Sequence, residues 1–328
     1  RSTLFPYTTL FRSRTGGPLA ARRRWRIAEI GFWLAVLAAY FLLPRQLLII
    51  NEIAILALFA LSLDLILGYA GIVSLGHAAF FGLGAYAAGI FAKHVAGDPL
   101  IGLALAAVLS AAVGFVTSFL VLRGSDLTRL MVTLGVSLVL HEIANSWSSF
   151  TGGADGLQGM SIGPVAGYFE FDLFGRTAAG YSLIVLFLLF LAARLIVTSP
   201  FGLSLRAIRE NPIRAGAVGV PVNRRRVAIY TLAAAYAGIS GALLAQTTQF
   251  VSLDVFEFQR SADVLLVLII GGTGYLYGGL IGAMVFKFMQ DALATATPQY
   301  WQFWIGLILV IIVLVGSDRP VLDRKSVV

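Results

Sequence analysis

Seven polar or ionisable residues lie inside stretches that are otherwise apolar, and their side chains are the first candidates for chemistry. They are Asp64, His141, Glu142, Asn145, Asp263, Lys287 and Asp291. A charge in hydrocarbon costs at least about 2.5 kcal/mol, so we expect these side chains to face a pore, a partner or one another. The four-residue spacing of Lys287 and Asp291 predicts an ion pair on one helix face. His141 and Glu142 are also compatible with contact with water at the membrane surface.

No enzyme motif accompanies these residues. The sequence contains no HExxH, no GxSxG and no cysteine, so we expect no catalytic residue, no metal ligand set and no cofactor. A GxxxxGK[ST] phosphate-binding loop is also missing from the sequence. If this chain takes part in ATP-driven transport, another protein must therefore bind and hydrolyse the nucleotide.

Residues 68–86 read GYAGIVSLGHAAFFGLGAY and form a glycine-rich stretch. A helix broken inside a membrane frees backbone N–H groups that can hold a carboxylate, which makes this stretch a candidate substrate path. The residues of that hypothesis are Ser74, Gly76, His77, Gly82 and Gly84. The alternative is tight helix packing, with His77 as a hydrogen-bonded core residue. A second glycine series, Gly274, Gly278 and Gly282, forms two GxxxG steps and predicts helix packing.

Residues 199–226 form the most basic segment of the chain. Residues 203–211, LSLRAIREN, predict a short amphipathic helix that Pro212 ends. Leu205 and Ile208 form its apolar patch. The residues that we expect to contact a partner are Leu203, Leu205, Arg206, Ile208, Arg209, Glu210 and Asn211. The alternative occupant of this surface is the lipid headgroup region.

The elements that position these residues are membrane helices. Of the 328 residues, 59% are hydrophobic and only 12% are charged, which predicts an all-α polytopic membrane protein. Apolar runs near 20 residues predict about ten transmembrane or re-entrant helices. Their expected ranges are 27–43, 47–67, a third ending near residue 94, 100–122, 130–147, 181–197, 227–249, 262–270, 280–296 and 301–315. The segment near Asp263 is short, so it is also compatible with a re-entrant element.

The positive charges are distributed unequally between the two sides of this topology. Fourteen arginines fall on one side and only Arg45, Lys93, Arg176 and Arg260 on the other. The positive-inside rule then predicts that both termini and residues 199–226 are cytoplasmic, and it explains the net charge of +8 without a nucleic-acid partner. Residues 1–13 and 323–328 resemble translated sequencing adapters, so we expect one permease domain over residues 14–322.

Three motifs, in order, resemble one known family. SLGHAAFFGLGAY at residues 74–86, TGGADGL at 151–157 and SPFGLSLRAIREN at 199–211 are similar to signatures of the permease subunits of branched-chain amino acid ATP-binding-cassette (ABC) importers. The M-type (LivM-type) subunit is the most similar of these. The resemblance covers residues 47–315. Leu203 and the run GGTGYLYGG (271–279) depart from the pattern, so urea, short amides and other amino acids remain candidate substrates.

The resemblance implies a function and a set of partners. It implies a bacterial inner-membrane permease, embedded in the lipid bilayer, that imports branched-chain or related amino acids. The implied partners are a second homologous permease subunit, two cytoplasmic ATP-binding subunits and an extracytoplasmic solute-binding protein. It also implies that residues 203–211 couple the permease to the ATPase. The residues themselves leave an alternative, an ion-coupled secondary transporter or channel that would use Asp64, Glu142 and Asp263.

Overall fold

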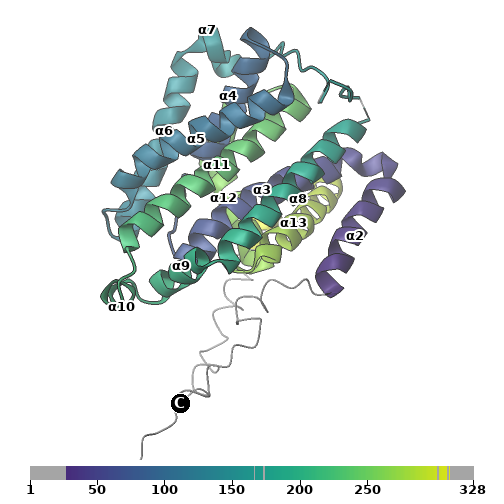
Figure 1. The fold of residues 1–328 in the computed structure, drawn as a ribbon. Coiled ribbons are helices and arrows are strands. Elements are labelled where there is room, and N and C mark those ends of the chain that lie inside the picture. The colour runs from purple at the N-terminus through teal and green to yellow at the C-terminus, as the bar shows by residue number, and fades with distance from the viewer. Residues whose placement is uncertain (1–26, 166, 173, 301–302, 309, 311–328) are drawn as a thin grey trace, which may run out of the picture.

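The computed structural model describes residues 27–165, 167–172, 174–300, 303–308 and 310. These residues fold into a bundle of helices (Figure 1), and extended pairing among them is limited to the isolated bridges Leu157–Val251 and Val165–Phe169. In chain order the helices are α2 (Ile27–Leu42), α3 (Leu47–Ala70), α4 (Ala78–His94), α5 (Pro99–Val121), α6 (Asp126–Ser146), α7 (Ser148–Thr151), α8 (Arg176–Thr198), α9 (Pro200–Glu210), α10 (Pro212–Ala217), α11 (Val222–Thr248), α12 (Phe258–Gly271) and α13 (Leu276–Ala296). The all-α prediction is confirmed.

Five helical stretches of the described chain are long and apolar enough to cross a membrane. They are Pro44–Ala70, Pro99–Val121, Asp126–Ser146, Arg176–Thr198 and Val222–Thr248. A sixth span results if α12 and α13 count as one broken element, and α2 is a shorter apolar helix. A helix therefore lies at each predicted position up to residue 296. Most of the predicted last segment, 301–315, and the predicted adapter-like ends, 1–13 and 323–328, lie outside the described residues.

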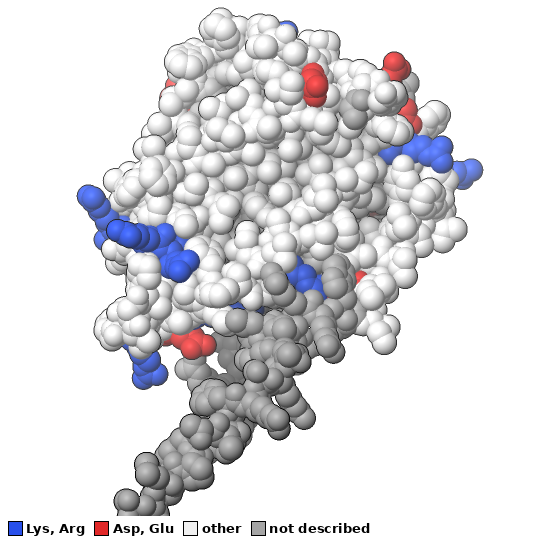
Figure 2. Space-filling view, in the orientation of Figure 1, with Lys and Arg blue, Asp and Glu red and all other residues white. Residues whose placement is uncertain are grey.

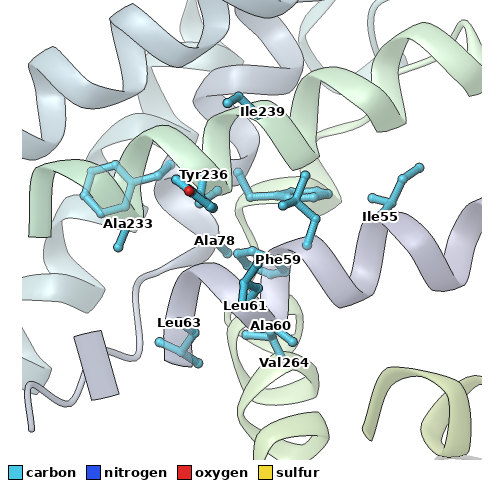
Figure 3. Packing of buried hydrophobic residues seen from close by; sticks show 14 of the residues in the cluster. Ile55, Phe59, Ala60, Leu61, Leu63, Ala78, Ala233, Tyr236, Ile239 and Val264 are labelled. Carbon is cyan, nitrogen blue, oxygen red and sulfur yellow. The ribbon is translucent and has the colours of Figure 1, made fainter. Parts of the chain in front are cut away.

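Helices α3 and α11 form the centre of the bundle. We compare the buried share of the most apolar 18 residues of each long helix. It is 83% in the stretch that contains α3 and 67% in α11, but only 17–33% in α5, α6 and α8. Helix α3 is apolar on every side, which is typical of a helix surrounded by other helices. The main buried cluster joins Phe59 of α3, Ala78 of α4, Tyr236 of α11 and Val264 of α12 (Figure 3). The outer helices expose apolar side chains, as expected for contact with lipid.

Helix α3 ends where the glycine-rich stretch begins. Gly71 follows the last helical residue with a left-handed φ of 69°, and its N–H bonds to the carbonyls of Ile66 and Leu67. Residues 71–77 then run as an irregular segment until α4 starts at Ala78. The chain returns along α3 in this segment, because His77 reaches Ser62, more than two turns before the end of that helix. The predicted helix break is therefore present.

Helices α12 and α13 meet at an angle of 111° across a break of four residues. Gly272 and Gly274, both with positive φ, lie in this break. The broken geometry agrees with the re-entrant alternative that the short segment near Asp263 left open. Irregular backbone leaves N–H groups without a helical partner, and α3 supplies one acceptor here, Asp64, for the Gly274 N–H.

Gly84 of α4 lies directly against the backbone of α11. A Cβ atom at this position would be 2.1 Å from the carbonyl oxygen of Gly238. We expect Gly84→Ala to lower the free energy of unfolding by about 1–3 kcal/mol, the usual cost of overpacking, because two helix backbones would have to separate. Thermal unfolding of the purified chain in detergent measures this.

Gly135→Ala is the matched control for this substitution. Gly135 is on α6, and a Cβ atom there would meet no atom within 4 Å. Alanine should be neutral or stabilising by up to about 1 kcal/mol at this helical position. Equal stability of the two variants would contradict the close approach of α4 and α11.

Candidate functional site

The predicted amphipathic helix is present as α9, and a second short helix, α10, follows it. Ser199 caps α9 by accepting a hydrogen bond from the Gly202 N–H, and Pro200 occupies the first turn. Asn211 repeats this arrangement for α10, since its side chain accepts from the Arg214 N–H and Pro212 follows it. The predicted end of α9 before Pro212 is confirmed. Two cap-and-proline pairs therefore fix where each helix starts.

The apolar face of α9 points into the protein. Leu205 and Ile208 have 0% and 1% of their surface exposed, and Leu205 belongs to the main buried cluster. The prediction that they form an exposed patch for a partner is therefore wrong, because the ends of α3, α8 and α11 already cover this face. Arg206 also faces inward, with its guanidinium 5.2 Å from the centre of the Tyr69 ring on α3. Arg209, Glu210 and Asn211 are exposed, as predicted.

A hydrogen-bonded cluster of Asp64, Gly68, Arg209 and Gly274 connects α9 to two other elements. Arg209 donates a hydrogen bond to the carbonyl oxygen of Gly68 in the last turns of α3. Gly274, in the break between α12 and α13, donates its N–H to Asp64 Oδ1 at 2.7 Å. Gly274 and Arg209 are adjacent, since a Cβ atom on Gly274 would be 3.0 Å from Arg209 Nη1. We name these four residues the α3–α9 cluster.

Helix α10 carries the exposed apolar residues of the basic segment. Ile213 is 85% exposed and Val218, directly after the helix, is 80% exposed. Leu203 on α9 is 38% exposed. Figure 2 shows Lys and Arg side chains along the left edge of this face and, beside an acidic side chain, at the lower left where α10 lies in Figure 1, while the middle of this face is nearly free of charge. An apolar tip among basic side chains is typical of a protein contact surface.

The candidate substrate path at residues 74–84 is packed within the chain. A Cβ atom on Gly76 would be 1.8 Å from the Thr133 carbonyl oxygen, and one on Gly82 would be 2.5 Å from the Phe256 ring. Ser74 and His77 are each 1% exposed. His77 Nε2 is 2.8 Å from Ser62 Oγ, and its ring stacks on Phe59 at 5.6 Å. These contacts support the packing alternative over the substrate path.

A polar cavity of about 300 Å³ lies elsewhere, between α3, α4, α11, α12 and α13. Its polar wall consists of Asn51, Glu52, Thr248, Arg260, Asp263, Lys287 and Gln290. Its apolar wall consists of Ile55, Leu56, Phe59, Phe81, Leu244 and Phe286. The cavity lies at the half of the bundle opposite α9, because it is formed by the start of α3 and the end of α11. Sequence reasoning missed it, although Asp263 and Lys287 were both recognised as polar residues in apolar segments.

The ion pair of Lys287 differs from the expected one. Lys287 Nζ is 2.6 Å from Glu52 Oε2 on α3, and the predicted pair with Asp291 is wrong. The packing of α13 against α3 brings Glu52 within reach, whereas Asp291 is exposed to the outside. Asp64, Glu142 and Asp263 do not share one site, because only Asp263 lines the polar cavity. Glu142 is exposed and accepts a hydrogen bond from Ser146.

The three glycines of the series at residues 274–282 have two different roles. Gly278 and Gly282 are buried on α13, where Cβ atoms would collide with the carbonyl oxygens of Gly272 and Val267. They allow α12 and α13 to pack closely, as predicted. Gly274 is on neither helix and has a φ of 83°, so the helix-packing prediction is wrong for it. It serves instead as the hydrogen-bond donor to Asp64.

Asp64 supplies the only acceptor shown for the Gly274 N–H in the described part of the chain. We expect Asp64→Leu to lower the free energy of unfolding by about 0.5–1.5 kcal/mol, because the hydrogen bond to the part-buried Gly274 N–H would be lost. Asp64→Asn keeps an oxygen at the same place and should cost less. Thermal unfolding of the two purified variants tests this, and a Leu variant as stable as the Asn variant would show that the hydrogen bond contributes nothing.

Comparison with known proteins gives the family. Residues 46–313 match the family described as "Branched-chain amino acid transport system / permease component". The high-affinity branched-chain amino acid transport system permease protein LivM of Salmonella typhimurium (strain LT2) is 27% identical over 296 residues, covering 82% of this chain and 69% of that protein. No solved structure matches the chain.

Other similar proteins are named for other substrates. The autoinducer 2 import system permease protein LsrC of Klebsiella pneumoniae is 29% identical, covering 89% of this chain and 85% of that protein. The ribose import permease protein RbsC of Escherichia coli (strain K12) is 24% identical, covering 83% and 84%. The resemblance seen in the three motifs is confirmed by the family match over most of the chain. This chain belongs to the family of permease components of branched-chain amino acid transport systems, and its apolar helices are those of an integral membrane protein.

Proposed function

We propose that this chain is a membrane-spanning subunit of an ABC importer that moves branched-chain or related amino acids into the cell. Its partners are a second permease subunit, two cytoplasmic ATP-binding subunits and an extracytoplasmic solute-binding protein. The family and the names of the similar permeases support this proposal. The missing phosphate-binding loop agrees with it, because energy must then come from another subunit.

The α3–α9 cluster is the observation that carries the proposal. An ATPase outside the membrane can drive transport only if a surface element is mechanically connected to the spanning helices. Helix α9 has that connection, because Arg209 bonds to the end of α3 and lies against the break between α12 and α13. A displacement of α9 must therefore move α3 or break this cluster. The buried Leu205 and Ile208 make α9 part of the permease body, so it transmits force.

Helix α10 is the surface that we assign to the ATP-binding subunit. Ile213 and Val218 present apolar surface beyond the body of the permease, and α10 follows α9 with only the cap residue Asn211 between them. Arg209, Glu210 and Arg214 supply charged groups at the rim of this surface. The positive-inside rule supports a cytoplasmic location for this end of the molecule and for both termini of the chain.

The alternative of an ion-coupled transporter has weaker support. Such a mechanism needs carboxylates along one path. Asp64 instead accepts a hydrogen bond in the α3–α9 cluster, and Glu142 is exposed on α6. Asp263 is the one member of this group on the polar cavity. Transport by vesicles that contain only this chain, without ATP, would favour the alternative.

Charge introduced at the tip of α10 should separate the permease from the ATPase. We expect the double variant Ile213→Asp/Val218→Asp to lose most co-purification of the ATP-binding subunits, because carboxylates would be buried in an apolar contact. Uptake should fall in parallel. Both residues are exposed, so the fold of the permease should be unaffected.

Tyr168→Asp provides the control, since Tyr168 is 87% exposed in the loop that precedes α8. Co-purification of the ATP-binding subunits should be the same as for the unaltered chain. Full retention of these subunits by the α10 double variant would overturn the assignment of α10.

A further inference from the structure

The geometry points to the polar cavity as a binding site for a zwitterionic α-amino acid with an aliphatic side chain. Glu52 and Lys287 on facing helices would hold the ammonium and carboxylate groups. This inference rests on the proposed transport function and names the substrate class of that function. It assigns the site to a different place from the glycine-rich stretch that the sequence indicated.

The charges of the cavity complement both ends of an amino acid. Lys287 and Glu52 form an ion pair at 2.6 Å, with side chains 23% and 52% exposed, so each is accessible from the cavity. Arg260 and Asp263 add a second cation and a second anion to the same wall. An amino acid can replace the ion pair with two new ones, carboxylate to Lys287 and ammonium to Glu52. This exchange leaves no buried charge without a partner.

A further polar group belongs to the cavity wall. In the described part of the chain the side-chain oxygen of Gln290 has no hydrogen-bond partner, and Gln290 lines the cavity on α13, one turn beyond Lys287. An acceptor without a partner is unfavourable, and a ligand N–H group that reached this oxygen would supply the missing hydrogen bond. Asn51, by contrast, is held by Ser182 and Thr247, so it forms a fixed part of the wall.

The other wall of the cavity is suited to an aliphatic side chain. It is formed by Ile55, Leu56, Phe59, Phe81, Leu244 and Phe286. Phe59 and Phe81 lie 4.7 Å apart, and Phe59 also stacks on His77. Apolar walls with a few placed polar groups are typical of small-molecule sites, and 300 Å³ is at the small end of their range. A sugar such as ribose would leave both the charged groups and the apolar wall poorly matched.

The same ion pair also lines a neighbouring cavity. Glu52, Lys287 and Gln290 line this second cavity of about 280 Å³ together with Ile49, Asp291 and Ala294, closer to the end of α13. The charged pair is therefore shared by both cavities, while the apolar side chains of Phe59, Phe81 and Phe286 line the first alone.

Cysteine labelling tests this site directly, because these 328 residues include no cysteine. Thr248→Cys places a single thiol on the cavity wall, and Glu170→Cys places one on an exposed loop. With the chain in nanodiscs, L-leucine should slow maleimide labelling at position 248 several-fold and leave position 170 unchanged. Isopentylamine, 4-methylpentanoate and D-ribose should protect far less, because each lacks at least one of the two charges.

A charge-free variant distinguishes the site from a general effect on folding. Glu52→Gln/Lys287→Gln removes both charges at once, so no unpaired charge is left behind. In the Thr248→Cys background, this variant should need an L-leucine concentration at least about tenfold higher for the same protection. That is the loss of affinity expected when hydrogen bonds to charged groups are removed. Asp126→Asn/Arg129→Met removes an ion pair at the start of α6 and should leave protection unchanged.

The outcomes separate this inference from the proposed function. If L-leucine protects position 248 but the assembled complex shows no ATP-driven uptake, the proposed amino acid site stands and the proposed importer function is wrong. If the complex takes up leucine with ATP but position 248 is not protected, the importer function stands and the proposed site is wrong. Equal protection by D-ribose, or by the singly charged analogues, would also overturn the site.

Discussion

The hydrogen bond between Gly274 and Asp64 holds the break between α12 and α13 against α3. These two helices turn through 111° there, and the N–H groups of the irregular backbone need acceptors that a continuous helix would have supplied. Asp64 supplies one from α3, the most deeply buried helix of the bundle. Gly68 makes the approach possible, because a Cβ atom there would be 2.0 Å from Asp64 Oδ1. Arg209 then joins α9 to the same place.

Helix α3 connects the two regions to which we assign function. Its end carries Asp64 and Gly68 beside α9, and its start carries Glu52 at the polar cavity. Twelve residues of helix separate Glu52 from Asp64, which corresponds to about 18 Å. One helix thus carries contacts to both regions, and α3 is the physical connection between α9 and the cavity.

Polar side chains bind the central helices together at the level of the cavity. Asn51 of α3 bonds to Thr247 of α11 and accepts from Ser182 of α8. Gln246 of α11 bonds in turn to Tyr181 and to the carbonyl of Pro99 at the start of α5. Each such bond between membrane helices contributes only about 0.6 kcal/mol on average. Their main effect is to fix the register of the helices, since a helix that slides by one residue loses all of these hydrogen bonds.

The sequence by itself predicted the approximate positions of the long helices, the end of α9 before Pro212 and the family. Apolar runs near the length of a bilayer crossing have few alternatives, and caps such as Ser199 and Asn211 act on the next turn of the same helix. Tertiary structure alone decided which face of α9 is buried, that Gly274 donates to Asp64, and that Lys287 pairs with Glu52 instead of Asp291. These contacts join residues far apart in the chain. Helical periodicity gives the face of a residue, but only packing gives its neighbour.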